Sequence, residues 1–203
     1  ERMRNAAFDP QETEAERGVV LSEREGAENQ PEFLAEEELW GLAFHIHPYH
    51  WTAIGYKQDL AKLDREPLYQ HYLRYYAPNN AFLVLVGGFD PAVAMQHLRE
   101  FFSPLKPEPA PPPMRLVEPD PHGERRRDLQ RPGAADLLFA GWPIPAFSHP
   151  DTPALILLST ILGGWRGFTA FAAGDWRPRS NRLYHALVES KLATDVTVRQ
   201  ELK

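Results

Sequence analysis

A proline-rich stretch interrupts this chain near its middle and divides it into two parts. Residues 104–121 hold eight prolines, among them the run Pro111-Pro112-Pro113. Proline fixes its own φ and lacks an N–H donor, so such a stretch favours extended, semi-rigid backbone over a helix or a sheet. We therefore expect an interdomain linker over residues 105–121, with one domain segment at 1–104 and another at 122–203.

The composition indicates a folded, acidic protein. Hydrophobic residues make up 43% of the 203 residues, which is enough to form a core. A net charge of -6 argues against nucleic-acid binding, which needs a basic face. The sequence contains no run of about twenty apolar residues, so no membrane-spanning helix is predicted. The chain has no cysteine, which excludes a disulfide framework and a thiolate zinc site.

Capping residues and hydrophobic periodicity predict helices combined with buried strands. Asp9-Pro10-Gln11-Glu12 is typical of a helix start, with Asp as N-cap, Pro first and Glu third. The expected helices are 10–28, 31–44, 59–63, 67–76, 91–102, 151–162 and 181–190. The expected strands are 81–87, 124–130, 136–142 and 196–198. This order predicts an α+β fold with layers of helix and sheet.

Two carboxylates, Glu16 and Glu23, lie seven residues apart on the first expected helix. Seven residues make about two turns at 3.6 residues per turn, so both side chains share one face. A divalent metal is one candidate cation for such a pair, and an ordinary acidic face with Glu23 paired to Arg17 or Arg24 is the alternative. No H-x-x-E-H or H-E-x-x-H motif accompanies them in this sequence.

A second group of candidate metal ligands, His45 and His47 with His50 nearby, follows the second expected helix. On an extended segment, side chains two residues apart can share a face without forming a ligand set. We therefore expect these histidines to have a structural use.

Several short motifs follow one another along the chain. They are Glu16-Arg17-Gly18-Val19-Val20-Leu21-Ser22-Glu23, His47-Pro48-Tyr49 with Ile54-Gly55, Tyr75-Tyr76-Ala77-Pro78-Asn79-Asn80-Ala81, Leu83-Val84-Leu85-Val86-Gly87-Gly88-Phe89-Asp90, Pro150-Asp151, Ile161-Leu162-Gly163-Gly164 and Arg182-Leu183-Tyr184. In order and spacing they resemble the pitrilysin/insulinase family of zinc metallopeptidases, and within it the branch of mitochondrial processing peptidases and their bacterial relatives.

The resemblance implies a split zinc site. Family members bind one zinc through two His of an H-x-x-E-H helix, whose Glu is the general base, and through a Glu on a later helix. Glu23 matches that later metal ligand, and Glu16 matches a supporting carboxylate behind it. The resemblance thus implies Zn²⁺ in the full-length parent, but no catalytic residue and no bound zinc in this chain alone. Residues 1–104 would end a first peptidase-like domain, and 122–203 would begin a second, noncatalytic one.

The resemblance also implies a function and partners. The parent would be a metalloendopeptidase that hydrolyses unfolded peptides or presequences in a chamber enclosed by two homologous halves or subunits, as a homodimer or a heterodimer. The main alternative is a noncatalytic subunit that positions substrate for an active partner, and a structural assembly subunit is a third. The opening Glu1-Arg2-Met3-Arg4 is typical of a domain interior, so we expect a fragment, with a cytoplasmic location only weakly favoured.

A glycine-rich loop is the expected substrate contact. In noncatalytic processing-peptidase subunits such a loop touches substrate, and Gly163, Gly164 and Gly167 match its position. The loop departs from the family pattern because residues 165–178 are inserted before Arg182-Leu183-Tyr184. The insertion carries four large aromatic side chains, which predicts apolar surface used in the chamber or against the partner half.

Overall fold

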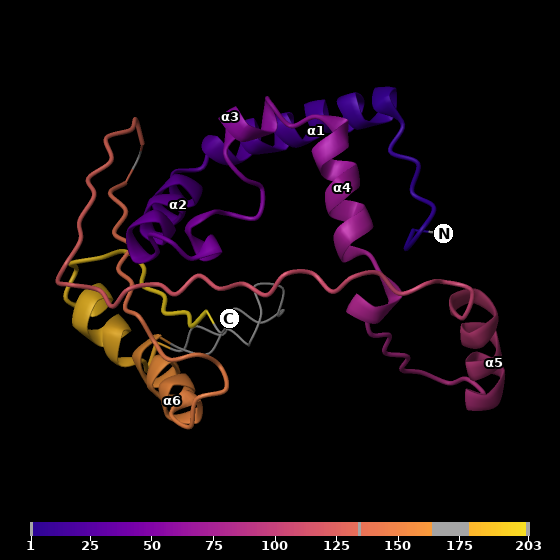
Figure 1. Cartoon of the computed structure of the whole chain (residues 1–203). Helices are drawn as coiled ribbons and strands as arrows, with labels where there is room; N and C mark the ends of the chain where they lie inside the picture. Colours follow the sequence, from indigo (N-terminus) through magenta and orange to yellow (C-terminus); the bar gives the residue numbers. More distant parts are fainter. Residues whose placement is uncertain (1, 134, 164–178, 202–203) are drawn as a thin grey trace. The chain divides into compact units, whose positions relative to one another are not determined.

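The computed structural model describes residues 2–133, 135–163 and 179–201 (Figure 1), and the chain divides into two units. The N-terminal unit is Glu1–Gly141 and the C-terminal unit is Trp142–Lys203. The proline-rich residues 105–121 thus lie inside the N-terminal unit, whereas the domain boundary expected there stays a prediction.

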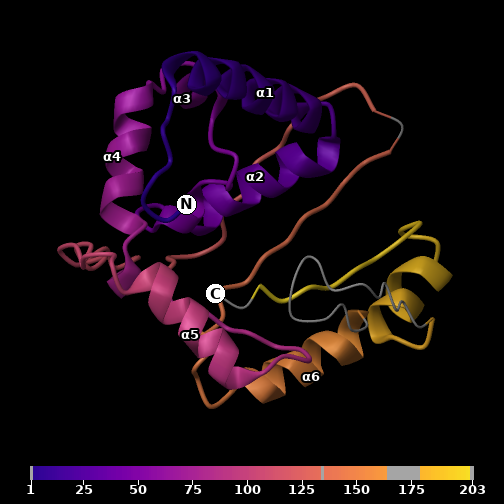
Figure 2. The same ribbon diagram turned by 90° about the vertical axis from the view of Figure 1, so that its right-hand side faces the viewer.

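Helices dominate the N-terminal unit. They are α1 (Pro10–Glu28), α2 (Pro31–Ala43), α3 (Lys57–Leu60), α4 (Arg65–Tyr75) and α5 (Pro91–Phe102), with short 3₁₀ turns η1 (Pro48–His50) and η2 (Pro78–Asn80). Each long helix lies within two residues of its expected bounds. Helix α1 packs against α2, α3 and α4, and α3 lies beside α1 in both views (Figure 1 and Figure 2).

Local capping chemistry explains where α1 and α5 begin. Asp9 Oδ1 accepts hydrogen bonds from the backbone N–H of Gln11 at 2.8 Å and Glu12 at 3.1 Å. Asp90 caps α5 in the same way, through the two N–H groups that follow Pro91. In both helices proline is the first residue, where its missing donor costs nothing. The helix start predicted at Asp9 is confirmed.

An aromatic cluster joins the N-terminal segment to α4. The Phe8 ring lies 5.6 Å from that of Tyr69 and 5.2 Å from that of Tyr72. Tyr72 is only 4% exposed, and its hydroxyl oxygen accepts a hydrogen bond from the backbone N–H of Ala6 at 3.3 Å. The Tyr72 ring is packed and its hydroxyl is hydrogen-bonded. These contacts hold the segment that leads into α1 against α4.

The expected strands do not appear as paired strands. Among the residues described, no segment forms a β-ladder, and 81–87, 124–130, 136–142 and 196–198 have irregular backbone. A strand needs neighbours for its N–H and C=O groups, and here the side chains of Phe82 and Val86 remain 93% and 92% exposed. The structure therefore supports the helices of the expected α+β fold but not its sheets.

The proline-rich stretch is tied down rather than free. The side chain of Asn79 and the backbone of Glu108 exchange two hydrogen bonds, of 2.9 and 3.0 Å. The Glu108 carboxylate also pairs with Arg4 at 2.7 Å. The proline-rich stretch, which has neither helix nor strand, is thus held to the rest of the N-terminal unit by contacts of Arg4 and Asn79 with Glu108.

The C-terminal unit contains α6 (Thr152–Gly163) and a π-helical turn, η3 (Tyr184–Glu189). The turn is shorter than the helix expected at 181–190. Gly163, at the end of α6, is buried, and a Cβ there would lie 2.5 Å from Val198 Cβ and 2.6 Å from its backbone N. None of the helices among the described residues has both the length and the apolar character to cross a membrane.

Candidate metal-ligating helix

The two predicted site carboxylates lie on α1, and both are exposed. Within the described part of the chain, Glu16 and Glu23 accept no hydrogen bond and form no ion pair. Glu23 does not pair with Arg17 or Arg24, because each arginine binds elsewhere, but an ordinary acidic helix face remains the alternative to a metal site. Exposed, unpaired carboxylates on a regular helix fit both expectations, so the metal-ligand role stays a prediction.

Arg24, the residue after Glu23, is 4% exposed and holds α1 against α2. Its two terminal nitrogens donate to the two carboxylate oxygens of Glu37, at 2.5 and 2.7 Å. Its Nε donates to Glu28 at 2.8 Å, and Nη1 also donates to the carbonyl of Gly55 at 3.1 Å. The guanidinium lies over the Phe33 ring, 4.9 Å from the centroid. We call these five residues the arginine clamp.

The arginine clamp favours the charged form of Arg24. The hydrogen bonds to Glu37 raise the pKa of the Arg24 guanidinium and outweigh burial, which lowers it. Thr52 Oγ1 adds a 3.3 Å hydrogen bond to Glu37. A fork-shaped guanidinium matched to a carboxylate is among the strongest polar contacts in proteins, so the clamp fixes α2 and the following loop to α1.

Arg17 repeats this arrangement one heptad earlier. Its Nη1 donates to the carbonyl of Ala61 at 2.7 Å, and its Nη2 donates to Glu14 at 2.5 Å. Arg17 and Arg24 lie on one face of α1, and from there both contact the segment around α3. Glu16 and Glu23 each precede one of these arginines by one residue. The sequence reasoning missed this role, although the seven-residue spacing of the arginines equals that of the glutamates.

One carboxylate does not make a zinc site. No cluster of three or more potential ligands exists within residues 2–133, 135–163 and 179–201. Zinc sites usually have three or four protein ligands. Glu23 as a metal ligand and Glu16 as its supporting carboxylate therefore stay predictions.

The rings of His47 and His50, which follow α2, are used for local structure, as expected. His50 Nδ1 lies 2.7 Å from the carbonyl oxygen of Phe44, and its Nε2 lies 3.3 Å from the hydroxyl of Tyr56. His47 Nδ1 accepts the backbone N–H of Tyr49 at 3.2 Å. With these ring nitrogens engaged, the histidines stabilise the turn η1.

Glu118 is a second residue that sequence reasoning missed. Its carboxylate accepts hydrogen bonds from three consecutive backbone N–H groups, those of His45, Ile46 and His47, at 2.7, 2.8 and 2.9 Å. Burial alone would raise the pKa of Glu118, but these donors lower it to about 2. The contact holds the proline-rich stretch to the end of α2, and nothing in the local sequence pattern marks it.

The glycine-rich loop is only partly described. Gly163 packs against Val198, whereas Gly164, Gly167 and the insertion 165–178 lie outside the described residues. Substrate contact at these glycines stays a prediction.

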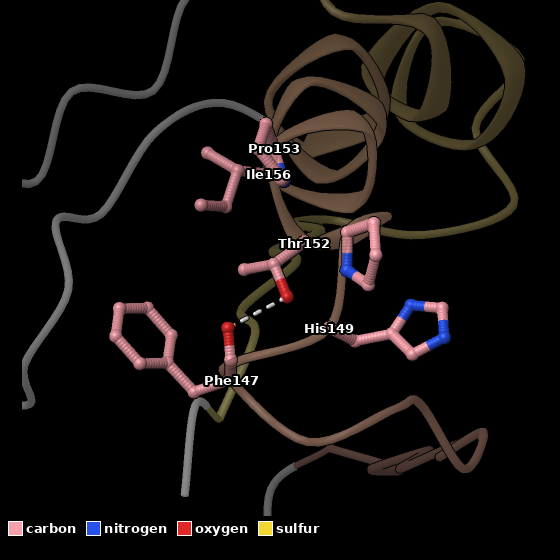
Figure 3. A pocket seen from close by; sticks show the side chains of 6 residues that line it. Phe147, His149, Thr152, Pro153 and Ile156 are labelled. Carbon is pink, nitrogen blue, oxygen red and sulfur yellow. Dashed lines mark hydrogen bonds between the residues drawn. The ribbon is translucent and has the colours of Figure 1, made fainter.

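A shallow pocket of about 370 Å³ lies at the start of α6 in the C-terminal unit (Figure 3). It is lined by Phe147, His149, Pro150, Thr152, Pro153 and Ile156. The Thr152 hydroxyl, which is the polar group drawn toward Phe147, donates to that residue's carbonyl at 2.9 Å. Its hydrogen is therefore already used, and the mostly apolar lining shows no catalytic arrangement.

The chain is similar to known peptidases. Residues 62–202 match the family model described as the peptidase M16 inactive domain. A protein of Helicobacter pylori named zinc protease PqqE is 32% identical over 152 residues, which are 73% of this chain and 34% of that protein. The mitochondrial-processing peptidase subunit beta of Bos taurus is 27% identical over 172 residues, 80% of this chain and 33% of its own length.

A solved structure is similar as well. The crystal structure of a protease from Helicobacter pylori superposes with a TM-score of 0.78 at 27% identity, over 96% of this chain and 45% of that chain. The chain spans about a third of the length of the two relatives named above, zinc protease PqqE and the Bos taurus subunit beta.

Proposed function

This chain belongs to peptidase family M16, and from that membership we propose that it forms part of a zinc-dependent metalloendopeptidase. The proposed parent hydrolyses unfolded peptides or presequences in an enclosed chamber. The observation that carries the proposal is α1, on which Glu16 and Glu23 are exposed and unpaired among the described residues while the adjacent arginines are engaged in packing. The similarity to a named zinc protease supports a metal in the parent.

Each carboxylate has a separate task in this proposal. Glu23 holds the metal through a carboxylate oxygen, and Glu16, one heptad earlier, helps to orient it. When bound, zinc lowers the pKa of a coordinated water toward about 7 and polarises the scissile carbonyl. The two His ligands and the general base belong to an H-x-x-E-H helix, a motif that this sequence lacks. The chain alone therefore neither holds zinc tightly nor cleaves peptides.

The α+β organisation and the partner belong to the same proposal. Residues 81–87 form an apolar run with highly exposed side chains, which is what a buried strand presents when its neighbours are missing. We propose that these residues join a sheet covered by the helices, in the two-layer arrangement. A homologous peptidase half or subunit then closes the chamber, and the relatives named as subunit beta support such an assembly.

A noncatalytic, substrate-positioning protein is the second candidate. The match to a model described as an inactive domain favours it. The presence of both Glu16 and Glu23 favours the enzyme instead, because an inactive partner has no metal-related reason to keep the pair. The glycine-rich loop would contact substrate in either case.

A zinc titration and a cleavage assay test the proposal together. By equilibrium dialysis at neutral pH, this chain alone should bind less than stoichiometric zinc at micromolar concentration. A longer parent protein with an intact H-x-x-E-H helix should bind one zinc per chain and cleave an unfolded peptide. A longer protein with a degenerate motif that binds the same peptide without cleaving it would support the noncatalytic candidate. Stoichiometric zinc on this chain alone would contradict the ligand assignment.

A further inference from the structure

We propose that Arg24 is a positioning residue for Glu23, setting the rotation of α1 so that the neighbouring carboxylate faces the metal. The inference rests on the proposed zinc function, and it assigns to the arginine clamp a task beyond holding two helices together. Arg24 itself touches neither metal nor substrate in this scheme.

The clamp fixes α1 from several directions at once. Arg24 binds Glu37 on α2, the carbonyl of Gly55 in the loop before α3, and Glu28 on its own helix. The Phe33 ring, which also belongs to α2, lies over the guanidinium. A planar group held by α2, a loop and a ring cannot turn about the axis of α1 without losing hydrogen bonds.

Apolar packing on α1 is too sparse to set its rotation by itself. Val19, between the two arginines, is 50% exposed, and Arg24 is the only fully buried residue of the helix. Arg17 supplies a second fixed point through its 2.7 Å hydrogen bond to Ala61. Two anchors seven residues apart define both the position and the rotation of a helix.

A small rotation matters at the carboxylate. A side-chain tip lies about 5–6 Å from the axis of a helix, so a rotation of about 10° moves it by about 1 Å. Successive residues are about 100° apart, which puts Arg24 in the packed face and Glu23 outside it. Groups that hydrogen-bond directly to a metal ligand typically change metal affinity by about 10- to 100-fold when they are removed, and Arg24, which acts only through the helix, should lie at or below the lower end of that range.

The test measures zinc affinity in the longer peptidase proposed above. Arg24→Met keeps the aliphatic stem but removes the fork, and it should raise the zinc dissociation constant, measured by chelator competition, by roughly 3- to 10-fold. The d–d absorption of the Co²⁺-substituted protein should shift as well. Glu25→Gln is the matched control: it breaks the exposed Lys57–Glu25 pair of 2.5 Å on the same helix, and it should change zinc affinity less than twofold.

Two further variants keep the outcomes distinct. Arg24→Lys retains the charge without the fork and should give a smaller shift of both readouts, so it decides the matter if Arg24→Met does not fold. Glu23→Gln tests the ligand itself. If Glu23→Gln leaves zinc affinity unchanged, the proposed function fails. If Glu23→Gln weakens zinc while both Arg24 variants leave affinity and spectrum unchanged, the positioning inference alone is overturned.

Discussion

Loss of the arginine clamp should destabilise the N-terminal unit by an amount that can be worked out from its burial. Arg24→Ala removes a guanidinium that is 4% exposed and leaves the Glu37 carboxylate, whose side chain is only 12% exposed, without its main partner. Breaking a fully buried ion pair from one side costs about 3–5 kcal/mol. The Glu28 carboxylate is more exposed, at 33%, and water can replace part of its contact. We expect the free energy of unfolding to fall by about 3 kcal/mol.

Urea unfolding followed by circular dichroism measures this change, and the slope of free energy against urea should stay constant. A double-mutant cycle with Glu37→Ala isolates the pair, and it should give a coupling of at least about 1.5 kcal/mol. Glu25→Gln, which breaks an exposed pair on the same helix, should cost less than about 1 kcal/mol. An Arg24→Ala loss no larger than that of Glu25→Gln would refute the clamp as an anchor.

Two further predictions concern the proline-rich stretch and the end of α6. The Glu118 carboxyl should titrate near pH 2 by NMR, well below the ordinary value of 4.5, because three N–H groups bind its charged form; the contact then stabilises fully above pH 4.5 and is lost as pH falls to about 2, and a midpoint near 4.5 would contradict it. Gly163→Ala should destabilise the C-terminal unit by about 1–3 kcal/mol in thermal unfolding, because its Cβ would meet the backbone N of Val198 at 2.6 Å. An unchanged melting temperature would show that this contact is not made.

The helices were predictable because their determinants are local. Asp9 and Asp90 each precede a proline, and the caps they form join residues two or three positions apart. The face shared by Glu16 and Glu23 likewise follows from helical periodicity alone. The roles assigned to these two carboxylates came instead from the resemblance to a peptidase family.

The missing features are non-local. The apolar run at 81–87 indicates a strand, but a strand forms only where another segment supplies its hydrogen bonds, and local sequence does not name that segment. Glu118 binds backbone groups 71–73 residues away, through a type of side chain that recurs throughout the chain. Arg24 is similar: its burial depends on Glu37 and Gly55, which only the packing of α1 brings near.

Zinc content before and after Glu23→Gln tests the central claim most directly. In the longer peptidase proposed above, metal analysis after gel filtration should give one zinc per chain, and Glu23→Gln should weaken zinc binding by at least about 100-fold while the circular dichroism spectrum stays unchanged. Glu16→Gln, as the supporting carboxylate, should weaken it by about 10-fold. A folded Glu23→Gln protein that keeps one zinc with unchanged affinity would contradict the account of α1 as the metal-ligating helix.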